Sequence, residues 1–207
     1  MTPPTAEPDY DARTALLVID VQNDFADPAG SLAVAGGEAV IPYLNRQVAL
    51  ARAAGARVVY TQDWHPPSTP HFARDGGIWP VHCVMDTWGA ELHPNLVVDG
   101  PTIRKGSAGE DGYSGFSVRD PISGRESLTE LDGLLRAAGI ERAVICGLAT
   151  DYCVKATALD ARRLGYRTLL LADGIRAVDL APGDGERALA EMAGAGVTVL
   201  GQPVAPR

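Results

Sequence analysis

The stretch Arg142-Ala-Val-Ile-Cys-Gly-Leu-Ala-Thr-Asp-Tyr-Cys-Val154 sets the pattern for the whole chain. Its first part, Arg142 to Cys146, is a short apolar run of the kind that forms a strand buried on both faces. After a glycine, the helix-capping pair Thr150 and Asp151 starts a segment that carries Cys153 in its first turn. This order predicts a strand that runs into a helix, the repeating unit of a parallel α/β sheet.

The same alternation extends in both directions along the chain. Apolar runs predict five further strands, at Thr14 to Asp20, Arg57 to Gln62, Pro101 to Arg104, Thr168 to Ala172 and Val197 to Leu200. Helical spacing predicts four helices, at Glu38 to Ala54, Ser127 to Ala138, about Asp151 to Leu164 and Gly185 to Ala193. We therefore expect a doubly wound α/β domain with a six-stranded parallel sheet, strand order 3-2-1-4-5-6 and helices on both faces.

Composition narrows the classes of partner and the compartment. The 207 residues carry a net charge of -8 without a basic cluster, which argues against a nucleic acid or an anionic membrane surface. Three cysteines without disulfide-type density favour a reducing cytoplasm, and no apolar run is long enough to span a membrane. We expect a flexible leader at residues 1–12, which lacks the apolar core of a signal peptide, and one domain at 13–207. A homo-oligomer is left open.

Three reactive groups follow predicted strands that lie close together in such a sheet. Asp20 ends the first strand, Lys105 follows the third and Cys153 follows the fourth, at the edge where these sheets bind ligands. Singly, the acid reads as a cap, the lysine as a solvated charge and the cysteine as buried filling. Together they offer a base, a cation and a thiol at a helix N-terminus, which a cysteine nucleophile requires.

A second group of side chains lies in the irregular, proline-rich region at about residues 63–100. Taken singly, each of its histidines reads as a surface or hydrogen-bonded residue, and its acid as a turn cap. Four such groups close together in sequence suit a divalent ion: Asp63, His65, His71 and His82. Imidazoles with one carboxylate favour Zn²⁺, while Fe²⁺ or Mn²⁺ are also admissible.

Several motifs, in this order, resemble the nicotinamidase/pyrazinamidase family of isochorismatase-like cysteine hydrolases over about Thr14 to Leu200. They are Asp-Val-Gln-Asn-Asp-Phe, Asp-Trp-His, Trp-Pro-Val-His-Cys, Arg-Lys-Gly, Tyr-Ser-Gly-Phe and Gly-Leu-Ala-Thr-Asp-Tyr-Cys-Val. The resemblance implies hydrolysis of nicotinamide, and also pyrazinamide, to the acid and ammonia through a cysteine thioester. It also implies the six-stranded sheet, a catalytic triad of Asp20, Lys105 and Cys153, and a metal at the four residues above.

Further site residues come from the same resemblance. A non-proline cis peptide bond is implied between Leu148 and Ala149, and the N–H groups of Ala149 and Cys153 are implied to hold the oxyanion. Three aromatic residues match the substrate-binding positions of the family: Phe25, Trp79 and Tyr113.

Other functions remain open on the sequence. The same triad could act on another small amide or on a vinyl ether, or the chain could be a non-catalytic member that kept the fold. A zinc-structured interaction module using Cys83 beside His82 would need a cysteine-rich ligand set, which the sequence lacks. The loop Ser107 to Asp120 could alter substrate preference.

Overall fold

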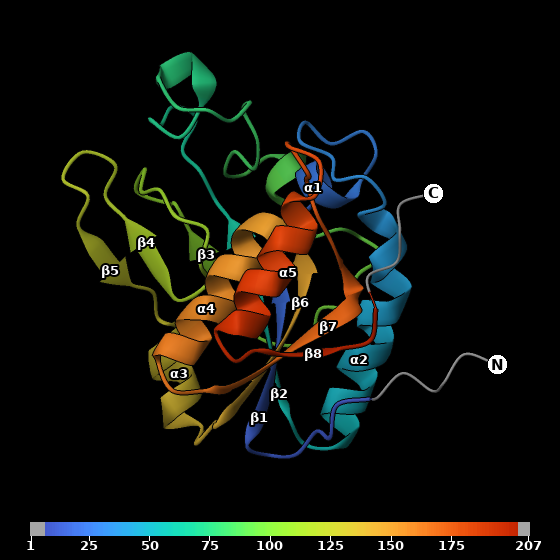
Figure 1. Cartoon of the computed structure of the whole chain (residues 1–207). Helices are drawn as coiled ribbons and strands as arrows, with labels where there is room; N and C mark the ends of the chain where they lie inside the picture. The colour runs from blue at the N-terminus through green and yellow to red at the C-terminus, as the bar shows by residue number, and fades with distance from the viewer. Residues whose placement is uncertain (1–6, 203–207) are drawn as a thin grey trace.

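A six-stranded parallel sheet organises the computed structural model, which describes residues 7–202. The strands stand in the order β3-β2-β1-β6-β7-β8 (Figure 1). Their bounds are β1 Thr14–Ile19, β2 Arg57–Asp63, β3 Thr102–Lys105, β6 Arg142–Leu148, β7 Arg167–Arg176 and β8 Thr198–Leu200. All five strand pairs are parallel, as the alternation of strands and helices predicted.

The predicted order 3-2-1-4-5-6 is corrected to 3-2-1-6-7-8, because two short strands were missed. β4 (Ser117–Arg119) and β5 (Glu126–Leu128) form an antiparallel pair outside the sheet, visible beside β3 in Figure 1. Ser127 pairs there with Val118, so the helix predicted from Ser127 begins only at Leu131. Apart from these insertions, the strands follow one another across the sheet as expected.

Helices cover both faces of the sheet. On one face lies α2 (Ile41–Ala53), after a 3₁₀ turn at Glu38–Val40. On the other lie α3 (Leu131–Ala137), α4 (Lys155–Arg163) and α5 (Asp184–Gly194). The connections hold α1 (Asn23–Ala26), 3₁₀ turns at Ala73–Asp75 and Trp88–Ala90, and a π-helical turn at Thr150–Val154.

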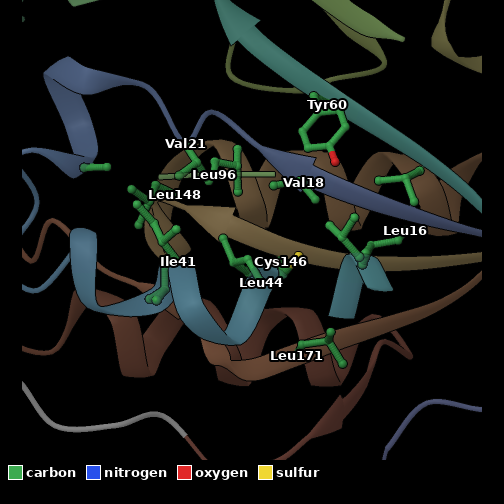
Figure 2. Packing of buried hydrophobic residues seen from close by; sticks show 14 of the residues in the cluster. Leu16, Val18, Val21, Ile41, Leu44, Tyr60, Leu96, Cys146, Leu148 and Leu171 are labelled. Carbon is green, nitrogen blue, oxygen red and sulfur yellow. The ribbon is translucent and has the colours of Figure 1, made fainter. Parts of the chain in front are cut away.

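Alternating side chains of β1 supply the two apolar layers. Leu16 and Val18 point to the α2 face, where Figure 2 shows them with Ile41 and Leu44. Leu17 lies between them in sequence, so it points to the opposite face of the sheet, where it packs into a second apolar cluster. Both faces are therefore buried, which explains why β1 reads as a continuous apolar run.

A glycine sets how closely β1 and β6 approach at their carboxyl ends. Gly147 pairs with Ile19 and has a φ of 113°, a conformation that side chains disfavour. A Cβ atom at Gly147 would lie 2.1 Å from the Ile19 carbonyl oxygen. This close approach brings the residue after β1, Asp20, next to the turn after β6.

Half of the segment predicted to be a flexible leader, residues 1–6, lies outside the described residues. In the other half Tyr10 is buried, and its hydroxyl donates to Gln47 Oε1 of α2 at 2.9 Å. Gln47 Nε2 in turn donates to Glu7 at 2.7 Å, so residues 7–10 pack along α2. Within residues 7–202, no helix combines the length and apolar character needed to cross a membrane.

Candidate active site

Four neighbouring strands deliver reactive side chains to one edge of the sheet. Asp20 follows β1, Asp63 ends β2, Lys105 ends β3, and Cys153 lies in the turn after β6. All four are buried, and Lys105 is among the largest side chains that are wholly enclosed. Burying charges is costly unless they are paired, so this cluster is held together by its own ion pairs.

Lys105 lies at the centre of the cluster. Its Nζ atom is 2.9 Å from Asp20 Oδ2 and 3.7 Å from Cys153 Sγ, and it also forms an ion pair with Asp63. Asp20, Asp63 and Cys153 each present an atom within 4.8 Å of the others. The predicted acid, cation and thiol are thus brought into contact.

Thr61 of β2 fixes the carboxylate of Asp20. Its hydroxyl donates to Asp20 Oδ1 at 2.6 Å and accepts from the Asp20 N–H at 3.2 Å. Asp20 has a φ of 47°, a left-handed conformation uncommon outside glycine and typical of functional sites. Oδ2 makes no hydrogen bond of good geometry within the described chain, and its near neighbour is the ammonium group of Lys105 at 2.9 Å.

Burial sets the protonation of the cluster. It raises the pKa of the Cys153 thiol well above its usual range, against the opposing charge of Lys105. Burial likewise raises the pKa of Asp20 against the same cation. For Lys105, burial would lower the pKa, but Asp20 and Asp63 raise it well above its usual range. The resting cluster therefore holds a protonated thiol beside a permanent positive charge.

The turn that carries Cys153 has the backbone that the motif implied. The Leu148–Ala149 peptide bond is cis, and both Ala149 and Cys153 line the pocket. Asp151 was predicted to cap the helix that follows β6, but no side-chain hydrogen bond caps the N-terminus of this π-helical turn. Its carboxylate instead accepts the N–H groups of Val178 and Asp179, each at 2.9 Å, and so anchors the loop after β7.

Three buried histidines form the second cluster. His65, His71 and His82 each present a ring nitrogen within 4.8 Å of the others. Asp63 Oδ2 lies 3.9 Å from Nε2 of both His65 and His82. For Asp63 itself, burial would raise the pKa, but Lys105 and His65 hold it well below its usual range. The four predicted metal ligands therefore converge.

The hydrogen bonds of the three rings show whether these residues fit a metal ion. His82 Nδ1 donates to the Pro80 carbonyl at 2.7 Å, and burial lowers the pKa of His82 to about 4, so the ring is neutral. His71 Nδ1 bonds Asp111 Oδ1 at 2.8 Å. Both ring nitrogens of His65 are buried without a hydrogen-bond partner in the part of the chain described. Such orphaned nitrogens call for a partner, and a divalent cation supplies one.

A pocket opens over both clusters. Phe25, Trp79 and Tyr113 line it, as do Cys153 and two of the histidines. Trp79 Nε1 donates to the Tyr113 hydroxyl at 3.0 Å. The pocket is thus an apolar, aromatic space with the thiol and the imidazoles in its wall.

Some pocket residues were not predicted from the sequence. Tyr152 packs edge-on against Trp79, with ring centroids 4.8 Å apart at 82°. Its place beside Cys153 was the one available signal. Three apolar residues in loops complete the wall and gave no signal: Leu32, Val34 and Val178.

Two other candidates lie apart from the imidazole cluster. The N–H of buried Cys83 donates to Asp24 Oδ2 at 2.7 Å, and Cys83 belongs to neither group of facing ligand atoms found in residues 7–202. His93 also lies outside both groups, and its Nε2 is 3.8 Å from Asp27 Oδ2. A zinc module built on Cys83 is therefore not supported.

Comparisons with known proteins agree with this geometry. A family model described as the isochorismatase domain matches residues 14–203. The nicotinamidase of Escherichia coli (strain K12) is 38% identical over 203 aligned residues, covering 89% of this chain and 93% of that protein.

Two solved structures share the fold at similar identity. The pyrazinamidase of Pyrococcus horikoshii, in complex with zinc, superposes with a TM-score of 0.81 at 40% identity, covering 92% of this chain and 99% of that one. PnC1 from L. infantum, in complex with nicotinate, has a TM-score of 0.81 at 38% identity, covering 92% and 93%.

Proposed function

The chain belongs to the isochorismatase family, and on that premise we propose that it hydrolyses nicotinamide to nicotinate and ammonia, and pyrazinamide likewise. The likeness to nicotinamidases and pyrazinamidases that the motifs predicted is confirmed by relatives that match most of the chain. The chain is thus a hydrolase that acts on an amide. One observation of the site supports this substrate: a buried thiol cluster and an imidazole cluster face the same aromatic pocket.

Acylation begins with a proton transfer from Cys153 to Asp20 Oδ2. Because burial raises the pKa of the thiol, its proton can be transferred only to a base that contacts it. The pKa of Asp20 is raised as well, so the difference in pKa between the thiol and its base is smaller. The sulfur then attacks the carboxamide carbon, the C–N bond breaks, and Asp20 returns its proton to the departing ammonia. Lys105 balances the negative charge of the cluster throughout.

The N–H groups of Ala149 and Cys153 stabilise the oxyanion of each tetrahedral intermediate. Both residues line the pocket at the turn that bears the sulfur. A single donor of this kind typically contributes about 2.7 to 4 kcal/mol to the transition state. In the second half-reaction Asp20 takes a proton from water and the hydroxide attacks the thioester. The C–S bond then breaks to release the acid, and Asp20 returns its proton to the sulfur, which regenerates the thiol.

Asp63, His65, His71 and His82 are the residues that would hold a divalent ion. When bound, such an ion offers a coordination site for the pyridine nitrogen and thereby orients the ring. We assign zinc, because three imidazoles with one carboxylate suit it. The zinc complex of the pyrazinamidase from Pyrococcus horikoshii supports this choice.

Phe25, Trp79 and Tyr113 bind the flat ring of the substrate. Phe25 and Trp79 are each less than a tenth exposed, so an aromatic ring between them would be almost fully removed from water. Tyr113 holds Trp79 through the hydrogen bond from its indole. This arrangement selects a planar heteroaromatic amide over an aliphatic one.

The cysteines support a reducing compartment such as the cytoplasm. Cys83, Cys146 and Cys153 are all free and buried. A nucleophilic thiol also needs protection from oxidation.

Ammonia release from nicotinamide tests the reaction. We expect Cys153→Ala and Asp20→Asn each to abolish it, while Cys146→Ala, which removes a buried thiol on the α2 face, serves as the matched control. Near-native turnover in either site variant would refute the assignment. A panel with pyrazinamide, an aliphatic amide and a carbamoyl amide tests the substrate class, because preference for the last two would favour another small-amide hydrolase.

Metal content tests the second cluster. Elemental analysis of the purified protein should find zinc in the wild type and little in the double variant Asp63→Ala with His65→Ala. Equal occupancy in the two proteins would refute the site.

A further inference from the structure

We propose that Asp111 is a positioning residue that orients His71 toward the metal ion. The proposal rests on the metal site proposed above and adds a residue that none of the motifs contains. Asp111 lies in the loop after β3, the same loop that was expected to influence the pocket.

The contact differs from those of the other two histidines. His71 Nδ1 lies 2.8 Å from Asp111 Oδ1, a charge-assisted hydrogen bond. His82 Nδ1 bonds a neutral backbone carbonyl, and His65 has no hydrogen-bond partner in residues 7–202. Among the three rings, only that of His71 is held by a carboxylate.

Such a bond fixes both the tautomer and the direction of the ring. When Nδ1 carries the proton and donates it to a carboxylate, Nε2 keeps its lone pair and becomes a stronger ligand. His71 also stacks against His65, with ring centroids 4.7 Å apart. A rotation of His71 would therefore disturb a neighbouring ligand as well.

Asp111 is itself held in place by the small hairpin that β4 and β5 form. Its N–H donates to the Arg119 carbonyl at 2.7 Å, and the Arg119 N–H donates back at 2.6 Å. The Gly112 N–H donates to Asp111 Oδ1 at 2.9 Å, and the Arg119 guanidinium lies 3.6 Å from Oδ2. The carboxylate thus has a fixed position from which to aim the ring.

The same segment also reaches the aromatic part of the pocket. Tyr113, two residues after Asp111, accepts the hydrogen bond from Trp79. The loop that carries β4 and β5 is therefore tied to the imidazole cluster at one residue and to the ring pocket at another. This gives the hairpin, which stands outside the sheet, a role in shaping the site.

Zinc affinity of the full-length protein tests the proposal. Metal-free protein would be titrated with zinc against a chromogenic chelator, using wild type, Asp111→Ala, Asp111→Asn and the control Asp120→Ala. Asp120 is an exposed carboxylate of the same hairpin, whose Oδ1 accepts from Ile122 and Ser123. Loss of such a carboxylate typically weakens metal binding by about 10- to 100-fold.

We expect that loss in Asp111→Ala, a smaller one in Asp111→Asn, whose amide oxygen still accepts a hydrogen bond, and none in Asp120→Ala. Wild-type affinity in Asp111→Asn and Asp111→Ala would overturn the proposal and leave the metal site standing. If Asp111→Ala does not fold, Asp111→Asn alone decides. Failure of the wild type to bind zinc would overturn both. The titration measures zinc binding without any amide substrate, so its result does not depend on whether the proposed amidase activity is found.

Discussion

Replacing Thr61 by valine should loosen the carboxylate of Asp20, the base of the proposed reaction, without emptying any space. Valine keeps the shape of threonine and exchanges its hydroxyl for a methyl group. The hydroxyl now donates to Asp20 Oδ1 at 2.6 Å and accepts from the Asp20 N–H at 3.2 Å. Both contacts are buried, so water cannot replace them.

The expected magnitude follows from these two contacts. A buried hydrogen bond to a charged group contributes about 1.5–3 kcal/mol, so the free energy of unfolding should fall by that amount. If the same energy is lost from the transition state, kcat/KM falls by about 10- to 160-fold, since each 1.36 kcal/mol is a factor of ten. KM should change little, because Thr61 does not line the pocket.

The pH profile separates a role in catalysis from a role in folding alone. Burial raises the pKa of Asp20, and the Thr61 hydroxyl is one of the groups that lower it. Removing the hydroxyl should therefore raise this pKa further. Because Asp20 acts as a carboxylate, activity falls as the pH drops through its pKa, and the acid limb of kcat/KM should move to higher pH.

Ammonia release across a pH series, together with thermal unfolding, checks this expectation. The control is Thr168→Val on β7, a buried threonine whose hydroxyl donates to the Tyr166 carbonyl at 3.1 Å away from the pocket. It should lose stability and keep the wild-type acid limb. An acid limb in Thr61→Val that stays in place, or moves to lower pH, would show that Thr61 does not tune the base.

Three further changes test the site at other points. Gly147→Ala puts a Cβ 2.1 Å from the Ile19 carbonyl oxygen, so the free energy of unfolding should fall by about 1–3 kcal/mol or more; an unchanged melting curve would contradict the close approach. Gly106→Ala puts a Cβ 2.7 Å from His65 Nδ1 and should weaken zinc binding by about tenfold in a chelator titration, an effect that normal affinity would disprove. Trp79→Ala should raise the KM for nicotinamide by about 2- to 12-fold, since an aromatic pair contributes about 0.5–1.5 kcal/mol, and an unaltered KM would place the ring elsewhere.

The sheet could be predicted because its signals are local. Buried parallel strands read as apolar runs, and Thr14–Ile19 and Arg142–Leu148 stand out without knowledge of their partners. From the order of the strands it followed that Asp20 and Cys153 lie at one edge, and the structure brings them together. The hairpin was missed because Ser127 and Leu128 owe their extended form to pairing with residues 117–118 rather than to any periodicity.

Within the site, the residues that carry chemistry were easier to find than those that hold them. Asp63 and its histidines stand out by type, whereas Asp111 is one acid among many until its contact with His71 is seen. Val178 lines the pocket, and its N–H donates to Asp151 from another part of the chain. Such support depends on three-dimensional neighbours, which residue type alone does not encode.

The position of Lys105 has a consequence for how proteins of this kind can diverge. Its ammonium group pairs with Asp20 of the thiol cluster and with Asp63 of the imidazole cluster. A lineage that discards the metal ligands would leave this cation with one counter-charge and would alter the proton affinity of the base at the same moment. Effects of substitutions in the two clusters should therefore not add. In evolution and in engineering, we therefore expect the proposed ring-binding cluster and the proposed thiol cluster to change together.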